Sequence, residues 1–344
     1  MKLKPWMRRA IPIALYVVLA VVLYLYLRDV HWGEIAAIQF NWGWLAIGTV
    51  VSLLSRYWMV LIWLVLLRSL GAGKFDNIPE LALVYAKSWL GRYIPGTAPW
   101  ILGKIYFASK RGLSKGKLAV SSFLEAGLQI ITLLLVGIVM LLIDPRTNVV
   151  AGWLRWAMIA ALLVGVVALL PPVFNAMARF GYRLIRKKEL DRADLPSWPT
   201  IIRGTLLYLV GAGFSGLSMF FVALAVDPSL SWDNLAFIIG AANLATAVSM
   251  IAIFAPGGVG VRETILITLL GIVMGKALAT ASSIVLRLWS IVIDFAFFGI
   301  AFLHAVIYNR VRKLPPPATV PAGEPVQPGD EDALLIAETE TETL

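Results

Sequence analysis

Charged and amide side chains lie within or beside long apolar stretches of this sequence, where burying a charge is expensive and usually marks function. The set comprises Arg56, Arg92, Lys104, Glu125, Gln129, Asn243, Arg262, Glu263, Arg287 and Asp294. Arginine supplies paired N–H donors that match a phosphate group. These residue types therefore point to an anionic ligand, or alternatively to ion pairs that only stabilise the protein.

Residues 91–104 cannot form one continuous helix. Proline removes backbone donors and glycine is a poor helix former, and the segment contains Pro95, Gly96 and Pro99. Arg92 and Lys104 flank this first break. Irregular backbone at membrane depth is tolerated only where protein or water covers its polar groups. The break is therefore a candidate site rather than part of a simple span.

A second break, residues 255–263, lies in the other half of the chain and contains Pro256, Gly257 and Gly258. Arg262 and Glu263 begin the helix that follows it. Helix N-termini carry exposed N–H groups and partial positive charge, which suit a phosphate. Paired breaks in two halves of a chain also indicate a transporter binding site. We expect both breaks to contact an anionic lipid headgroup. In the alternative interpretation, the Pro-Gly sequences only mark loops and the charges pair for stability.

Four further charged residues are assigned to a pathway or to coupling: Arg56, Glu125, Arg287 and Asp294. Arg287 and Asp294 are seven residues apart, so they share one helix face about two turns apart. Glu125 and Gln129, four apart, also share a face.

Soluble-enzyme signatures do not fit this chain. It contains no cysteine and only two histidines, so thiolate metal sites and cysteine nucleophiles are excluded and no metal cluster is expected. The lysine at 104 lacks the spacing of a P-loop, and the glycines at 257–260 follow no strand. We therefore predict no cofactor, no metal, no catalytic residue and no enzymatic activity.

The elements that position these residues are expected to be membrane helices. The chain has 344 residues, of which 60% are hydrophobic and 15% charged, and its mean hydropathy is +0.83. This composition predicts an all-α polytopic membrane protein, with about eight transmembrane helices, a re-entrant helical hairpin at 78–109 and an internal pseudo-repeat as an option. The predicted spans are 11–27, 44–67, 118–143, 155–173, 205–226, 235–254, 261–274 and 279–308. The segment 261–274 is short, and we leave open whether it spans or is re-entrant.

The distribution of charged residues predicts the orientation of the chain in the membrane and the boundary of its membrane domain. The chain carries 30 basic and 20 acidic residues, and basic loops favour the cytoplasmic face and anionic headgroups over nucleic acid. Both termini are expected in the cytoplasm. Residues 1–314 should form the membrane domain, and the Pro-rich, acidic residues 315–344 a disordered tail. The basic segment 174–203 should include an interfacial amphipathic helix, and this segment or the tail could bind a protein partner.

The motifs resemble the lysylphosphatidylglycerol synthase transmembrane-region family, the flippase-like integral membrane proteins. The resemblance covers most of residues 10–308 and rests on Gly91–Gly96, Gly103-Lys104, Leu124-Glu125, Pro256–Glu263 and Arg287. The chain differs at Ala126 and Gln129, where members often carry an arginine and an acid. The resemblance implies a cytoplasmic-membrane protein that moves, or helps to move, a lipid between leaflets. Lysyl transfer belongs to a separate cytosolic domain in such proteins and is not expected here.

Three functions follow as hypotheses. The first is a flippase or transporter of a phospholipid or of a lipid-linked anionic headgroup. The second is a membrane-embedded transferase for a lipid-linked substrate, with Glu125, Glu263 or Asp294 as its base. The third is a scaffold partner of a cell-envelope glycosyltransferase.

Overall fold

The computed structural model describes residues 39–72, 77–93, 98–110, 113, 115–149, 152–186, 195–251 and 260–311, and these form helices and no strand. The helices are α3 (Trp42–Ser69), α4 (Ile78–Trp89), η1 (Leu90–Tyr93), α5 (Ala98–Ser109), α6 (Lys115–Ile143), η2 (Pro145–Val149), α7 (Gly152–Ala168), α8 (Pro171–Arg186), α9 (Trp198–Val226), η4 (Trp232–Asn234), α10 (Leu235–Ile251), α11 (Val261–Met274) and α12 (Lys276–Val311). The predicted tail and the span 11–27 lie outside the described residues.

Within these ranges, five helices are long and apolar enough to cross a membrane: α3, α6, α9, α10 with η4, and α12. A sixth span is counted if α7 and the start of α8 are taken together. The prediction of an all-α multi-pass membrane protein is therefore confirmed, whereas the count of eight spans is not. The segment 261–274 forms α11, whose 14 residues reach only about 21 Å. This is shorter than the hydrocarbon core of about 30 Å.

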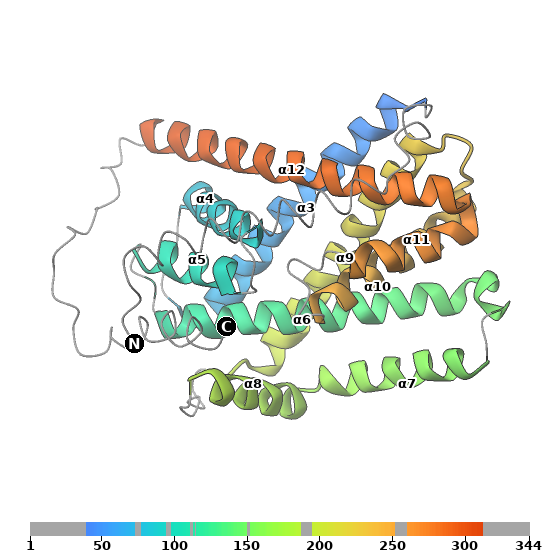
Figure 1. Cartoon of the computed structure of the whole chain (residues 1–344). Helices are drawn as coiled ribbons and strands as arrows, with labels where there is room; N and C mark the ends of the chain where they lie inside the picture. The colour runs from blue at the N-terminus through green and yellow to red at the C-terminus, as the bar shows by residue number, and fades with distance from the viewer. Residues whose placement is uncertain are drawn as a thin grey trace, which may run out of the picture.

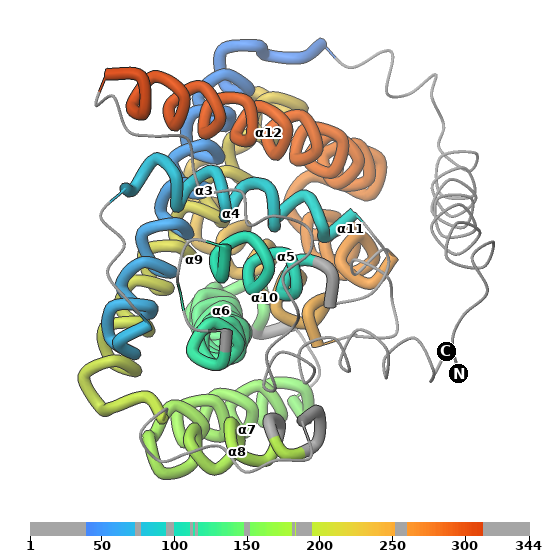
Figure 2. The backbone as a smooth tube through the Cα atoms, turned by 90° about the vertical axis from the view of Figure 1, so that its left-hand side faces the viewer, coloured from blue at the N-terminus to red at the C-terminus, as the bar shows by residue number. Residues whose placement is uncertain are grey.

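The helices stack in the same order in two perpendicular views, with α12 at one edge, then α4, α5 and α6, and α7 with α8 at the opposite edge (Figures 1 and 2). Within this arrangement α3 packs along α9, and α6 packs along α10. Glycines permit the closest approaches. A Cβ atom on Gly137 of α6 would lie 2.7 Å from the backbone nitrogen of Leu244 on α10.

The predicted re-entrant hairpin appears as two short helices that pack against each other, α4 and α5. Each has 12 residues and reaches about 18 Å, too short to span. The break is narrower than 91–104, because α5 begins at Ala98 and includes Lys104. Pro99 is the second residue of α5, where a backbone N–H would have no partner within the helix.

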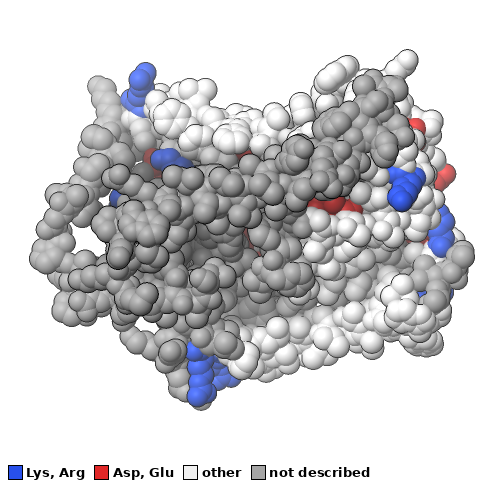
Figure 3. All heavy atoms as spheres, in the orientation of Figure 1, with Lys and Arg blue, Asp and Glu red and all other residues white. Residues whose placement is uncertain are grey.

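Helix α8 supplies the helix expected within 174–203, but it begins earlier, at Pro171, and is bent by 85° from α7. Its exposed side chains combine apolar Met177 and Phe180 with basic Arg179 and Arg183. A group of Lys and Arg side chains lies over one end of this helix, and further charged side chains lie at the opposite end of the helix bundle (Figure 3). This combination suits a helix at the membrane surface.

At the C-terminal end of α6, an ion pair between Asp144 and Arg146 lies in the α6–α7 turn, and Arg146 also contacts the turn before α10. Asp144 accepts hydrogen bonds from the Nε and Nη2 atoms of Arg146 at 2.8 and 2.9 Å. Arg146 also donates to the side chain of Asn234, before α10. These hydrogen bonds hold the pKa of Asp144 below its ordinary value of 3.8. The contact fixes the α6–α7 turn against the α9–α10 turn.

Candidate functional site

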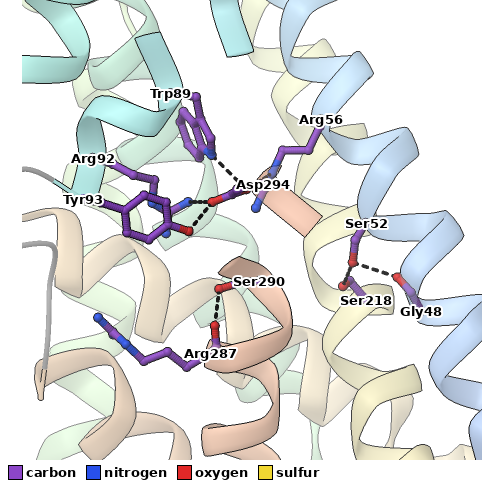
Figure 4. A network of polar contacts seen from close by, with 10 residues as sticks. All are labelled: Gly48, Ser52, Arg56, Trp89, Arg92, Tyr93, Ser218, Arg287, Ser290 and Asp294. Carbon is purple, nitrogen blue, oxygen red and sulfur yellow. Dashed lines mark hydrogen bonds and ion pairs between the residues drawn. The ribbon is translucent and has the colours of Figure 1, made fainter. Parts of the chain in front are cut away.

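The carboxylate of Asp294, in the middle of α12, receives four donors from α3, α4 and η1 (Figure 4). Its Oδ1 atom accepts from Arg56 Nε at 2.8 Å and from Trp89 Nε1 at 3.1 Å. Its Oδ2 atom accepts from the Tyr93 hydroxyl at 2.6 Å and lies 3.4 Å from Arg92 Nη1. Asp294 is buried, and an ionised carboxylate can accept about four such bonds. Three hydrogen bonds and one ion pair therefore hold this carboxylate in place.

Trp89 brings the two arginines together. The guanidinium carbons of Arg56 and Arg92 lie 5.2 and 4.8 Å from the centroid of its ring. Cations at these distances are attracted by the ring face. The last residue of α4 thus contacts both the charge on α3 and the charge at the first break.

A second ion pair joins α11 to α12. Arg287 Nη1 donates to Glu263 Oε1 at 2.5 Å, and the backbone N–H of Gly260 donates to Glu263 Oε2 at 2.8 Å. Gly260 has a φ of +86°, a conformation that favours glycine. This turn starts α11 and places Glu263 opposite Arg287. The predicted shared face of Arg287 and Asp294 therefore carries two different ion pairs.

Arg262, the second residue of α11, brings a fourth guanidinium to this region. It interacts electrostatically with Arg92, Arg287, Arg56 and Glu263. Its Nε atom is buried and has no hydrogen-bond partner among the described residues. Residues that border the two breaks, Arg92 and Arg262, are thus within electrostatic range of each other. Pro95, Gly96, Pro256, Gly257 and Gly258 lie outside the described residues.

Lys104 lies apart from the arginines, in a buried pair between α5 and α6. Its Nζ atom donates to Glu125 Oε2 at 2.5 Å, and the two side chains are 0% and 2% exposed. The Tyr85 hydroxyl donates to the other carboxylate oxygen at 3.1 Å. The rings of Tyr85, Trp100 and Trp63 surround the ammonium, with centroids 4.1, 4.7 and 5.1 Å from Nζ. The charges of Lys104 and Glu125 neutralise each other inside the bundle.

Of the remaining predicted polar residues, Asn243 serves helix packing. Its Nδ2 atom donates to the carbonyl of Ala212 on α9 at 3.1 Å and to that of Ile239 at 2.8 Å. Sequence reasoning missed Trp89, Tyr93 and Tyr85, whose polar atoms contact the carboxylates. Tyr93 directly follows Arg92 in the first break, and this position was the available signal. Within the described residues there is no cluster of metal-ligating side chains.

Helices of spanning length around two buried carboxylates and their partly exposed arginine partners define a multi-pass membrane protein with an ionic site within its helix bundle. Comparison with protein families matches residues 11–297 to the family described as lysylphosphatidylglycerol synthase TM region. The match covers most of the chain, which therefore belongs to this family, as its motifs indicated. No curated protein matches the chain.

Proposed function

We propose that this protein moves, or helps to move, a lipid with an anionic headgroup between the leaflets of the cytoplasmic membrane. The observation that carries the proposal is the convergence of four arginines from α3, η1, α11 and α12 on two carboxylates. Like charges at low dielectric repel strongly, so such a cluster is costly unless an anion joins it. A lipid phosphate supplies that anion.

The geometry supports an exchange of anions at Arg92. This arginine is the most loosely held of the donors to Asp294, at 3.4 Å, and its side chain is 34% exposed. Arg56 is closer, at 2.8 Å, and 18% exposed. We therefore expect Arg92 to leave Asp294 and contact the headgroup first, while Arg56, Trp89 and Tyr93 keep the carboxylate in place. Arg262, with its unpartnered Nε, is the second expected contact.

The roles proposed for the other sequence-derived residues change accordingly. Lys104 is fully buried and paired, so we assign it to holding α5 against α6 rather than to headgroup contact. Glu263 and Asp294 orient the arginines, and Arg287 and Arg56 line the site. The two Pro-Gly segments remain proposed contacts of the headgroup through their backbone N–H groups.

The transferase alternative receives less support. Glu125, Glu263 and Asp294, the three proposed bases, each accept a hydrogen bond from a cationic side chain at 2.5 to 2.8 Å. A general base needs an oxygen within reach of the substrate proton, and these oxygens are already in use. A pathway for an anionic lipid, by contrast, needs arginines that carboxylates hold in position, and this is the arrangement of the site.

Reconstitution of the purified chain in liposomes tests the proposal. Tail-labelled NBD phosphatidylglycerol and NBD phosphatidic acid report the accessible leaflet through quenching by dithionite. We expect Arg92→Gln combined with Arg262→Gln to slow exchange about tenfold or more, because both headgroup contacts are lost. Arg179→Gln, on exposed α8, is the matched control and should keep the wild-type rate. Equal rates in the double variant and wild type would refute the assignment of these arginines.

A further inference from the structure

The charges of the site also define the class of phosphate it accepts. Resting on the proposed function, we infer that the arginine cluster selects a phosphate monoester, which is a dianion, over the phosphodiester found in most lipid headgroups. The juxtaposition behind this inference is four guanidinium groups facing only two carboxylates among the described residues.

Among the residues that the structure describes, the charge balance leaves two positive charges without a counter-ion. The guanidinium groups belong to Arg56, Arg92, Arg262 and Arg287, and the carboxylates to Asp294 and Glu263. The tyrosine that faces the cluster, Tyr93, donates its hydroxyl to Asp294 and adds no charge. The neighbouring segments 94–97 and 252–259 contain no ionisable side chain in the sequence.

The charges of both carboxylates are already counted in this balance, because each forms an ion pair with arginine. Asp294 accepts three hydrogen bonds and forms an ion pair with Arg92, and Glu263 accepts one hydrogen bond from Arg287 and one from the Gly260 backbone. The Lys104–Glu125 pair, whose charges cancel, contributes no net charge. Arg262 Nε has no hydrogen-bond partner among the described residues, and Arg92 is loosely held, so we expect these two groups to bind the anion.

A phosphate monoester matches this requirement in charge and in acceptors. It carries about −1.5 to −2 charges at pH 7 and three terminal oxygens, with a second pKa of about 6. A phosphodiester carries a single charge and would leave one cation uncompensated, which is costly away from water. A headgroup with an added ammonium would bring a further positive charge toward the arginines. The chemistry is shared by free phosphate and by a lipid phosphate, and the probes below separate them.

The experiment measures binding to the full chain in lipid nanodiscs. The probes are dioleoyl phosphatidic acid, dioleoyl phosphatidylglycerol and inorganic phosphate, and the readout is the dissociation constant from titrated shifts in thermal unfolding. At pH 7.5 we expect phosphatidic acid to bind about tenfold tighter than phosphatidylglycerol. At pH 5, below its second pKa of about 6, the monoester gains one proton and becomes a monoanion, so its advantage should disappear while phosphatidylglycerol binding stays constant.

Variants test whether the arginine cluster is the source of the preference for phosphatidic acid. Arg262→Gln removes an expected headgroup contact and reduces the excess to one positive charge, so it should weaken the binding of both lipids but weaken that of phosphatidic acid more, which abolishes the preference. Arg179→Gln, on the exposed surface of α8, changes the net charge of the protein equally and should keep the preference. If Arg262→Gln does not fold, the two pH values for the wild-type protein still decide the question.

Each remaining outcome has a definite meaning. Equal affinities of wild-type protein for both lipids at pH 7.5 would overturn dianion selection and leave lipid movement standing. Binding of neither lipid would overturn the inference and the proposed function together. Inorganic phosphate that binds as tightly as phosphatidic acid would support dianion selection but contradict a lipid as the ligand.

Discussion

Lys104 shows how a single residue can be charged, buried and yet unavailable to a ligand. Its ammonium is covered by three aromatic rings and neutralised by Glu125. Taking both charges out of water costs several kcal/mol per ion, which the pair recovers only through close geometry and further hydrogen bonds. Tyr85 supplies such a bond to the carboxylate. The pair and Tyr85 therefore join three elements, α4, α5 and α6.

We predict that Lys104→Met lowers the free energy of unfolding by about 3–5 kcal/mol, because Glu125 is left charged and unpaired in the bundle. Replacing both partners, in Lys104→Met with Glu125→Leu, should restore most of this loss. Unfolding in mixed micelles titrated with SDS measures both variants, and the double-mutant cycle gives the coupling. A double variant no more stable than the single one would contradict the ion-pair role.

The sequence predicted which residues carry charge at depth, but not their partners. Arg56 and Asp294 are 238 positions apart, and Tyr93 and Asp294 are 201 apart. Spacing along the chain is informative only within one helix. There it placed Arg287 and Asp294 on one face correctly, but each binds a different partner. The partners depend on tertiary packing, which local periodicity does not encode.

At the scale of the elements, the apolar runs predicted the long helices to within several residues, whereas their ends and breaks were less accurate. Helix α9 begins at Trp198 rather than at residue 205, and α5 begins within the predicted break. Prolines in the first turn of α5 and α9 explain part of the difference, since helices tolerate proline there. The close glycine contacts between helices could not be predicted, because they depend on which helices are neighbours.

Two glycines of α9 provide a matched test of this packing. A Cβ atom on Gly216 would lie 2.8 Å from the backbone Cα of Ile239 on α10, whereas one on Gly213 meets nothing within 4 Å. We expect Gly216→Ala to destabilise the protein by about 1–3 kcal/mol, as overpacking does. Gly213→Ala should be neutral or stabilising by up to about 1 kcal/mol. Thermal unfolding in detergent compares them, and equal midpoints would argue against the α9–α10 contact.

At the scale of the whole molecule, composition predicted the class of fold and the motifs predicted the family, and both are confirmed. The number of spans was harder, because length and apolarity do not distinguish a crossing helix from one that ends inside the membrane. Helix α11 is apolar but too short, and α4 and α5 return within the bundle. Such short helices occur where irregular backbone is covered by protein.

The orientation of the chain remains a prediction that single cysteines can test, because the protein contains none of its own. The basic loops place Lys110, after α5, in the cytoplasm and Ser229, between α9 and α10, outside, and both residues are exposed. We expect a membrane-impermeant maleimide to label Ser229→Cys in intact cells, and Lys110→Cys only after permeabilisation. The wild-type chain gives the background. Labelling of Lys110→Cys in intact cells would show that the orientation is the reverse of the predicted one, with the first break and Arg92 on the outer side of the membrane.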